Sequence, residues 1–334
     1  MQKYYTYYIE CLKSWWMITV SFIIYHLSFR PKAAILSFTI LSFSGAAAQT
    51  WMHHPQANAT QQVWFRHDLS LHDVPQQMHL NVASAGRFIV YVNGYHVSKE
   101  LFSGNADGAV ALHVYDVTRF LRSGDNIIGV WYAPAPEGYT TDDAMLRQLN
   151  ITLAGITADG HHFTMDDSKG WFCRQANARI TMGGEFIDGM NYKSSWNTGP
   201  LRIMEWLPTA CIAEDGRWKT ENNSLRVMQW QSDDTHAFYI KRILQRAKVI
   251  QQGRTIIYDF GEPVNGWVRV TLRGCKKGEM VEVNGLRYVC TGKTDEQACR
   301  RFTTGEAGTA RIILPAGRGR SNIARVEAVE IYSK

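Results

Sequence analysis

Two carboxylates at close spacing, Glu185 and Asp188, are the residues of this 334-residue chain best placed for acid–base chemistry. Cleavage of a glycosidic bond usually needs two facing carboxyl groups, about 5–5.5 Å apart for retention and about 6.5–9.5 Å apart for inversion. A loop could bring Glu185 and Asp188 together, and a cleft would have to raise the pKa of one of them so that it acts as an acid. The spacing alone does not require this chemistry.

A second candidate chemistry is the recognition of sugar rings. Sugar sites combine an aromatic ring, which covers the apolar C–H face, with planar polar groups that pair with hydroxyls. Trp131 and Tyr132 close an expected strand, and the other residues of both kinds lie in stretches that we expect to form loops at one end of the fold. These candidate carbohydrate-binding residues are Trp131, Tyr132, Tyr139, Glu185, Asp188, Tyr192 and Trp196. The alternative for Trp131 and Trp196 is that they are core residues beneath the loops.

Patterns typical of metal sites are weak. The pairs His53-His54 and His161-His162 have no partners at zinc-ligand spacing, and no Cys-x-x-Cys occurs. Asn105-Ala106-Asp107-Gly108 offers oxygen ligands that would suit a sugar or calcium, although simple turn formation explains the same residues equally well. We therefore predict no metal ligand and no required cofactor, and we leave calcium open.

The elements that must position these residues are β-strands, because hydrophobicity alternates with a period of two from Val63 onward. Asn93-Gly94 is the strongest hairpin signal, and a short helical turn is expected at 116–121. Strands of the first group are expected at 63–69, 78–82, 88–92, 110–115, 127–132, 149–157 and 162–165. Strands of the second group are expected at 225–230, 255–260, 267–272, 280–283, 311–314 and 326–331.

This pattern predicts an all-β fold with two antiparallel β-sandwich domains of the jelly-roll, galactose-binding-like type. The first would cover residues 49–208 and the second, shortened one residues 225–334. A polar linker without periodicity would join them at 209–224. The chain length also suits about two domains.

Residues 1–48 have the composition of an export signal. Arg30 and Lys32 precede a short apolar run that ends in Gly-Ala-Ala-Ala, so we expect cleavage after Ala48. The alternative is an N-terminal membrane anchor that includes the apolar run 15–27, although both runs are shorter than the ~18–20 residues of a confident span. The protein is therefore expected in the periplasm or outside the cell, with membrane contact only through an uncleaved N-terminus.

Charge and cysteine content bear on partners and on the redox compartment. The chain has 36 Lys+Arg and 30 Asp+Glu, and residues 273–325 hold eleven basic and five acidic side chains. Such a face could attract an acidic polysaccharide, whereas export argues against nucleic acid; scattered solubilising charges are the simpler explanation. Five cysteines follow residue 48, so at least one thiol stays free, and a pair such as Cys290 and Cys299 could join in an oxidising compartment.

A series of short motifs, in the same order, resembles the N-terminal domain of bacterial α-L-rhamnosidases. The similarity covers roughly residues 60–330. The motifs are Tyr91-Val92-Asn93-Gly94, Tyr115-Asp116-Val117-Thr118, Gly124-Asp125-Asn126-Ile127-Ile128-Gly129-Val130, Ala158-Asp159-Gly160 with Trp171, Gly184-Glu185-Phe186-Ile187-Asp188, and Asp259-Phe260-Gly261 followed by Gly266-Trp267.

In that family the sandwich domains precede a large α/α barrel that carries the catalytic carboxylates, and this sequence has no matching barrel motif. The resemblance thus implies a sugar-binding role, and it places Glu185 and Asp188 in a non-catalytic domain. We expect an exported, non-catalytic protein that binds rhamnose-containing or acidic glycans, with no catalytic residue. Two alternatives stay open: part of an α-L-rhamnosidase whose barrel lies elsewhere, and a scaffold for a glycosidase partner.

Overall fold

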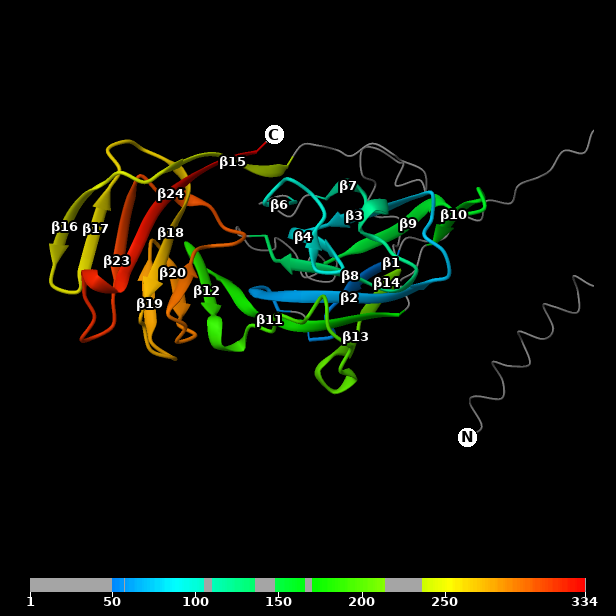
Figure 1. Cartoon of the computed structure of the whole chain (residues 1–334), viewed down its shortest axis with the longest axis horizontal. Coiled ribbons are helices and arrows are strands. Elements are labelled where there is room, and N and C mark those ends of the chain that lie inside the picture. The colour runs from blue at the N-terminus through cyan, green and yellow to red at the C-terminus, as the bar shows by residue number, and fades with distance from the viewer. Residues whose placement is uncertain are drawn as a thin grey trace, which may run out of the picture. The chain divides into compact units, whose positions relative to one another are not determined.

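The computed structural model describes residues 50–56, 58–104, 110–135, 148–165, 170–213 and 236–333 (Figure 1). Within these ranges the chain forms β-strands and short 3-10 turns. The turns are η1 (Thr118–Phe120), η2 (Gly189–Asn191), η3 (Ile203–Glu205) and η4 (Arg320–Asn322).

The strands of the first half are β1 (Thr50–His53), β2 (Gln61–Leu71), β3 (Gln77–Ser84), β4 (Arg87–Val92), β5 (Tyr95–His96), β6 (Phe102–Ser103), β7 (Ala111–Asp116), β8 (Gly124–Ala133), β9 (Asn150–Ile156), β10 (His162–Met165), β11 (Trp171–Thr181), β12 (Gly184–Asp188), β13 (Leu207–Pro208) and β14 (Ala210–Ala213). Those of the second half are β15 (Ala237–Leu244), β16 (Lys248–Gln252), β17 (Thr255–Asp259), β18 (Asn265–Arg273), β19 (Met280–Val283), β20 (Leu286–Val289), β21 (Asp295–Ala298), β22 (Gly305–Glu306), β23 (Thr309–Ile313) and β24 (Ile323–Ser333).

The first half is a sandwich of two antiparallel layers. One layer has the order β10-β9-β3-β7; in the other, β2 pairs with β8 and β11, and β8 also pairs with β4. Inward side chains of both layers, such as Phe65, Val130, Leu80 and Leu153, share one hydrophobic core. Because each large apolar side chain contributes about 1.5–3 kcal/mol when it is fully buried, this core is the main source of the stability of the first half.

The second half has its own hydrophobic core. Its longest pairing joins β18 to β24, while β17 pairs with β16 and β23, and β19 pairs with β20 and β23. Val270, Val281 and Ile312 are fully buried at the centre. The period-two pattern thus buries one face of each strand, as expected for a sandwich.

Two strand pairings join the halves, and residues 47–334 group as one compact unit. Strand β12 runs parallel to β20, with Glu185 opposite Leu286, and β6 pairs antiparallel with β15. A Cβ added at Gly184 would collide with the carbonyl oxygen of Gly285, so the close approach of β12 requires glycine there. A third buried cluster contains rings from both halves: Trp64, Trp131, Trp196, Trp267 and Phe302.

The structure confirms the predicted all-β class with antiparallel sandwiches, and it differs locally in two places. Residues 184–188 form β12 and not an irregular loop, because they pair with β11 and β20. Residues 210–213 of the predicted linker form β14 against β1. The predicted strand 225–230 lies outside the described residues, as does the signal segment 1–48; the domain boundaries stay a prediction.

Two asparagines of the sequence motifs connect the hairpin after β4 to the start of β8. The Asn93 side chain accepts a hydrogen bond from the backbone N–H of Ile127 (2.9 Å) and donates one to Oδ1 of Asn126 (2.9 Å). Asn126 is fully buried, and its amide pairs with both backbone groups of Arg122 (3.0 and 2.7 Å) and the carbonyl of Gly124 (3.0 Å). These motif positions are therefore structural in this chain.

We expect Asn126→Ala to lower the free energy of unfolding by about 2–4 kcal/mol, because its three hydrogen bonds to the backbone and the one from Asn93 would be lost together. Urea denaturation followed by tryptophan fluorescence measures the change. Asn191→Ala, on an exposed turn, is the control and should stay within about 0.5 kcal/mol of the unmodified protein. An equally small effect at Asn126 would contradict the structural role.

Candidate functional site

The junction between the halves is organised by one buried carboxylate. Oε1 of Glu185 accepts the backbone N–H groups of residues 301–303 at 3.0, 2.7 and 2.6 Å, and it also accepts the Thr303 hydroxyl at 3.0 Å. Oε2 accepts the side-chain amide of Gln62 (3.3 Å), whose own oxygen accepts the indole N–H of Trp131 (2.8 Å). Glu185 and Gln62 are both fully buried. A charged acceptor with this many donors holds the 301–303 segment in one geometry.

Two consecutive arginines at the start of this segment, Arg300 and Arg301, make different contacts. The Arg301 guanidinium carbon lies 4.0 Å from the centre of the Trp131 ring, a cation–π distance, and its charge also acts on the phenol of Tyr91. Burial raises the pKa of Tyr91, and the Arg301 charge partly offsets the effect, so the phenol stays protonated. Arg300 instead donates to carbonyl groups on the side of β12 and β20.

The surface around Arg301 is backed by packed aromatic rings. Tyr192 stacks on Trp131 with ring centres 6.2 Å apart and 21° between the planes, and it meets Trp64 edge-on at 6.0 Å. Trp196 stacks on Trp64 at 5.5 Å. The three tryptophans are at most 4% exposed, whereas Tyr192 is 44% exposed. We call Tyr91, Tyr192 and Arg301 the aromatic–arginine surface.

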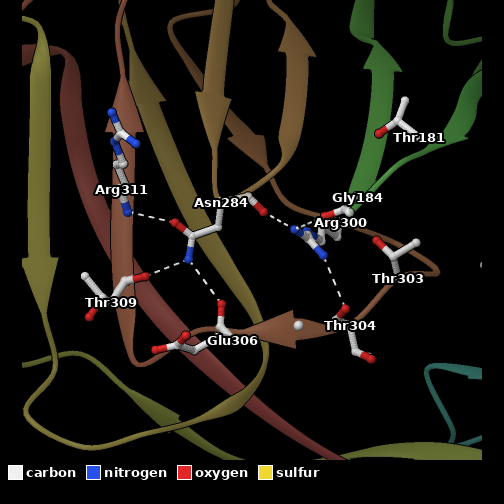
Figure 2. A pocket seen from close by; sticks show the side chains of 11 residues that line it. Thr181, Gly184, Asn284, Arg300, Thr303, Thr304, Glu306, Thr309 and Arg311 are labelled. Atoms are coloured by element: carbon white, nitrogen blue, oxygen red, sulfur yellow. Dashed lines mark hydrogen bonds between the residues drawn. The ribbon is translucent and has the colours of Figure 1, made fainter.

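A separate polar pocket of 570 Å³ lies where the β11–β12 turn meets the β19–β20 turn and residues 303–306 (Figure 2). Figure 2 shows Arg300 donating to the carbonyl groups of Asn284 and Thr304 at its wall. Arg300 is 8% exposed, and burial lowers its pKa while the charge of Glu185 raises it. The lining holds threonines, Glu306 and Arg311 but no aromatic ring. This pocket therefore has polar groups for a ligand without the ring that covers a sugar face.

The structure brings Trp131, Glu185, Tyr192 and Trp196 of the predicted sugar-binding set to one junction. Trp131, Glu185 and Trp196 are buried, as is Tyr132, which packs on Phe65 in the first sandwich core. Since a buried side chain offers no face to a ligand, Trp131 and Trp196 are core residues beneath the surface, the alternative considered from the sequence.

Asp188 and Tyr192 are the described members of the predicted set that reach the surface. Asp188 caps η2, because its carboxylate accepts the Met190 N–H (3.0 Å) and the Asn191 amide (2.6 Å). The side chains of Glu185 and Asp188 are thus each engaged in separate structural contacts. Tyr139 and the calcium candidate 105–108 lie outside the described residues.

Among the described residues, no group of three or more His, Cys, Asp or Glu side chains could hold a metal ion. His53-His54 is buried and His161-His162 sits on the exposed β9–β10 hairpin. No helix in the described ranges has the length and apolar character needed to cross a membrane.

Sequence reasoning missed Tyr91, Arg301 and Gln62 as parts of this junction. Arg301 contacts Trp131 although 170 positions separate them in the sequence. Gln62 forms a hydrogen bond with Glu185 across a sequence separation of 123 positions. Neither contact has a local sequence signal. The Glu185 motif was visible, but its role depends on the distant 301–303 segment.

Comparison with known proteins is consistent with this architecture. Residues 73–229 match the sequence model of the α-L-rhamnosidase N-terminal domain. The resemblance to the α-L-rhamnosidase N-terminal domain is thereby confirmed. No curated protein matches the sequence significantly.

Solved α-L-rhamnosidase structures share the fold of this chain. They include the enzymes from Dictyoglumus thermophilum (TM-score 0.65, 17% identity), Aspergillus terreus (0.67, 18%) and Streptomyces avermitilis in complex with L-rhamnose (0.63, 15%). The matches cover 86%, 86% and 83% of this chain. The chain spans only 35%, 36% and 29% of those enzymes, respectively, so the likeness concerns their non-catalytic part.

The Gly184–Asp188 motif joins the two halves of the chain. Gly184 allows the close approach to β20, Glu185 binds the 301–303 segment, and Asp188 caps the turn that leads to Tyr192. The residues that looked most like a pair of catalytic acids therefore have structural contacts that explain their presence.

We expect Glu185→Gln to reduce the free energy of unfolding by about 2–4 kcal/mol, because the new NH₂ group meets N–H donors where the carboxylate accepted them. Chemical denaturation at neutral pH gives the value. Glu306→Gln, on the exposed rim of the Arg300 pocket, is the matched control and should change stability by less than about 0.5 kcal/mol. Equal stabilities for both variants would rule out the anchoring role of Glu185.

Proposed function

We propose that this protein is an exported, non-catalytic carbohydrate-binding module that holds glycans on the aromatic–arginine surface. The observation that carries the proposal is the Tyr192 ring, 44% exposed and stacked on the buried Trp131, with Arg301 over the same tryptophan. This arrangement combines an aromatic face with a planar polar group, the two features that sugar sites need.

The rings beneath the surface support a rigid platform. Tyr192 contacts both Trp131 and Trp64, so binding a ligand costs little additional ordering of its side chain. An exposed tyrosine held in this way can cover the apolar face of a sugar ring. Its hydroxyl can pair with the ligand at the edge.

The polar groups favour an acidic or hydroxyl-rich ligand. Arg301 is half-buried, and its guanidinium carries a fixed charge in a fork geometry that suits carboxylates and paired hydroxyls. Lys193 is exposed next to Tyr192 in the chain. A rhamnose-containing glycan with uronic acids would meet both requirements, which is why we propose such glycans as the ligand class.

The match to the N-terminal domain of the family and the engagement of both Glu185 oxygens support a non-catalytic role. The second candidate is that the chain serves as part of an α-L-rhamnosidase whose barrel is supplied separately, because it spans only 35% and 36% of two of the similar enzymes. In that case a glycosidase would be its partner, and the chain would act in the periplasm or outside the cell.

The test is calorimetric titration of the purified protein with L-rhamnose and rhamnogalacturonan fragments, with calcium and with chelator. We expect saturable binding that Tyr192→Ala weakens by roughly tenfold, about 1.4 kcal/mol, because the stacking face is lost. Arg301→Ala should weaken the binding of acidic fragments more than the binding of neutral L-rhamnose. Added salt should reduce that difference in affinity.

Controls separate this surface from the neighbouring pocket and from catalysis. Tyr192→Phe keeps the ring and should retain most of the affinity, and Thr304→Ala in the Arg300 pocket should leave it unchanged. If Thr304→Ala abolishes binding while Tyr192→Ala does not, the ligand occupies the pocket. Release of sugar by the purified chain, lost in Asp188→Asn, would show an enzyme and overturn the proposal.

A further inference from the structure

Strand β16 lies at an edge of the second half. It pairs with β17 in the register that places Ile250 opposite Ile257, and no other strand within the described ranges pairs with it. Figure 1 shows β16 and β17 together at the left end of the second half. The open edge of a strand carries a row of main-chain donors and acceptors that a further strand can use.

The turn between β16 and β17 determines which main-chain groups lie on the open edge. Gln252 lies opposite Thr255 across two turn residues, and the first of these, Gly253, has a φ of 60°, as in a type II′ hairpin. In such a hairpin the closing pair bonds across the ladder, and bonding then alternates along the strand. Every second residue of β16 therefore bonds to β17, whereas Val249 and Gln251 direct their N–H and C=O groups to the open edge.

The side chains of β16 leave this edge accessible. Ile250 is 52% exposed although it is a large apolar residue, and Gln251 and Gln252 beside it are exposed as well. Val249 is half-buried and packs against the core of the second half, so it holds the strand in place. The edge thus offers main-chain groups and one apolar side chain to a strand from outside.

Basic side chains surround the same edge. Residues 237–258 include five lysines or arginines and no acidic residue. Two of the five pair with Glu330 on β24. The other three, Arg246, Lys248 and Arg254, are exposed and form no ion pair with any described residue. These three exposed cations give the edge a positive charge.

This charge decides between two kinds of partner. The one acidic residue of β17, Asp259, lies opposite Lys248, but its carboxylate accepts the N–H of Gly261 (2.8 Å) and has no ion pair in the described part of the chain. A second copy of the chain would bring the same three cations to a shared edge, and like charges facing each other across strands are destabilising. An acidic strand would place opposite charges there instead.

We propose that β16 is a docking edge for an extended, acidic segment of a partner protein, which adds to the sheet as a further strand. The segment bonds through its main chain to Val249 and Gln251 and places an apolar side chain against Ile250. Acidic side chains on either side of this apolar residue meet the three exposed cations. The aromatic–arginine surface takes no part, so the inference is independent of the sugar-binding role.

The test is fluorescence anisotropy with the purified chain and a labelled synthetic peptide in which three valines are flanked by three aspartates on each side. We expect saturable binding that weakens as salt is added, because the contacts between charges are exposed. A peptide with lysines in place of the aspartates should bind roughly tenfold more weakly or not at all.

Two variants at one position isolate the main-chain contact. Gln251→Pro removes an N–H on the open edge and leaves the bonds to β17 in place, since proline is tolerated on edge strands. It should weaken binding of the aspartate peptide by roughly tenfold or more, whereas Gln251→Ala, which keeps the N–H, should stay within about twofold. The exposed pair Arg246→Glu/Lys248→Glu should weaken the aspartate peptide similarly and improve binding of the lysine peptide. This pair replaces Gln251→Pro if the proline variant does not fold.

Hydrogen exchange tests the edge directly. In the free protein the amides of Val249 and Gln251 should exchange faster than the amide of Ile250, which bonds to β17. The aspartate peptide should slow the exchange of both.

Three results would overturn the inference. One is equal binding of the two peptides, or binding of neither. Another is unchanged affinity in Gln251→Pro protein that has native fluorescence. The third is slow exchange of Val249 and Gln251 in the free protein, which would show that the edge is already paired, within the chain or with a second copy. Loss of glycan binding with intact peptide binding would count only against the function proposed above.

Discussion

The carboxylate of Glu185 is fully buried and therefore requires hydrogen-bond donors. The rest of the structure depends on this requirement. A buried charge without partners costs several kcal/mol, so the chain must present donors to it, and it does so with three backbone N–H groups from the other half. Satisfying this one group fixes the 301–303 segment and, through Gln62, the orientation of the Trp131 indole. The position of Arg301 follows from the first contact, and the second fixes the Trp131 ring on which Tyr192 stacks.

The fixed segment directs the adjacent side chains of Arg300 and Arg301 to different surroundings. Arg300 donates hydrogen bonds to main-chain carbonyl groups and so connects the two halves. Arg301 keeps its charge near the surface and shares Trp131 with Tyr192. One arginine therefore maintains the junction, and the other remains able to meet a ligand.

The fold class was predictable because alternation of apolar and polar residues is local, as in β10 and β19, whose bounds were predicted correctly. The candidate site was predictable only in part. Tryptophans occur both in hydrophobic cores and in sugar-binding platforms. The sequence alone therefore could not assign Trp131 and Trp196 to either role, because the role depends on which residues surround them in the fold. Gln62 and Arg301 act through contacts more than 100 positions away, which no spacing rule detects.

The parallel pairing of β12 with β20 also determines where this chain can be divided. A fragment that ended at residue 213 would contain most of the region that matches the family, yet it would expose one edge of β12 and leave Glu185 without its backbone donors. Unpaired strand edges are templates for association with other chains. The segment recognised by sequence similarity is therefore smaller than the unit that pairs both edges of β12, and the second half covers the edge of β12 that the first half leaves open.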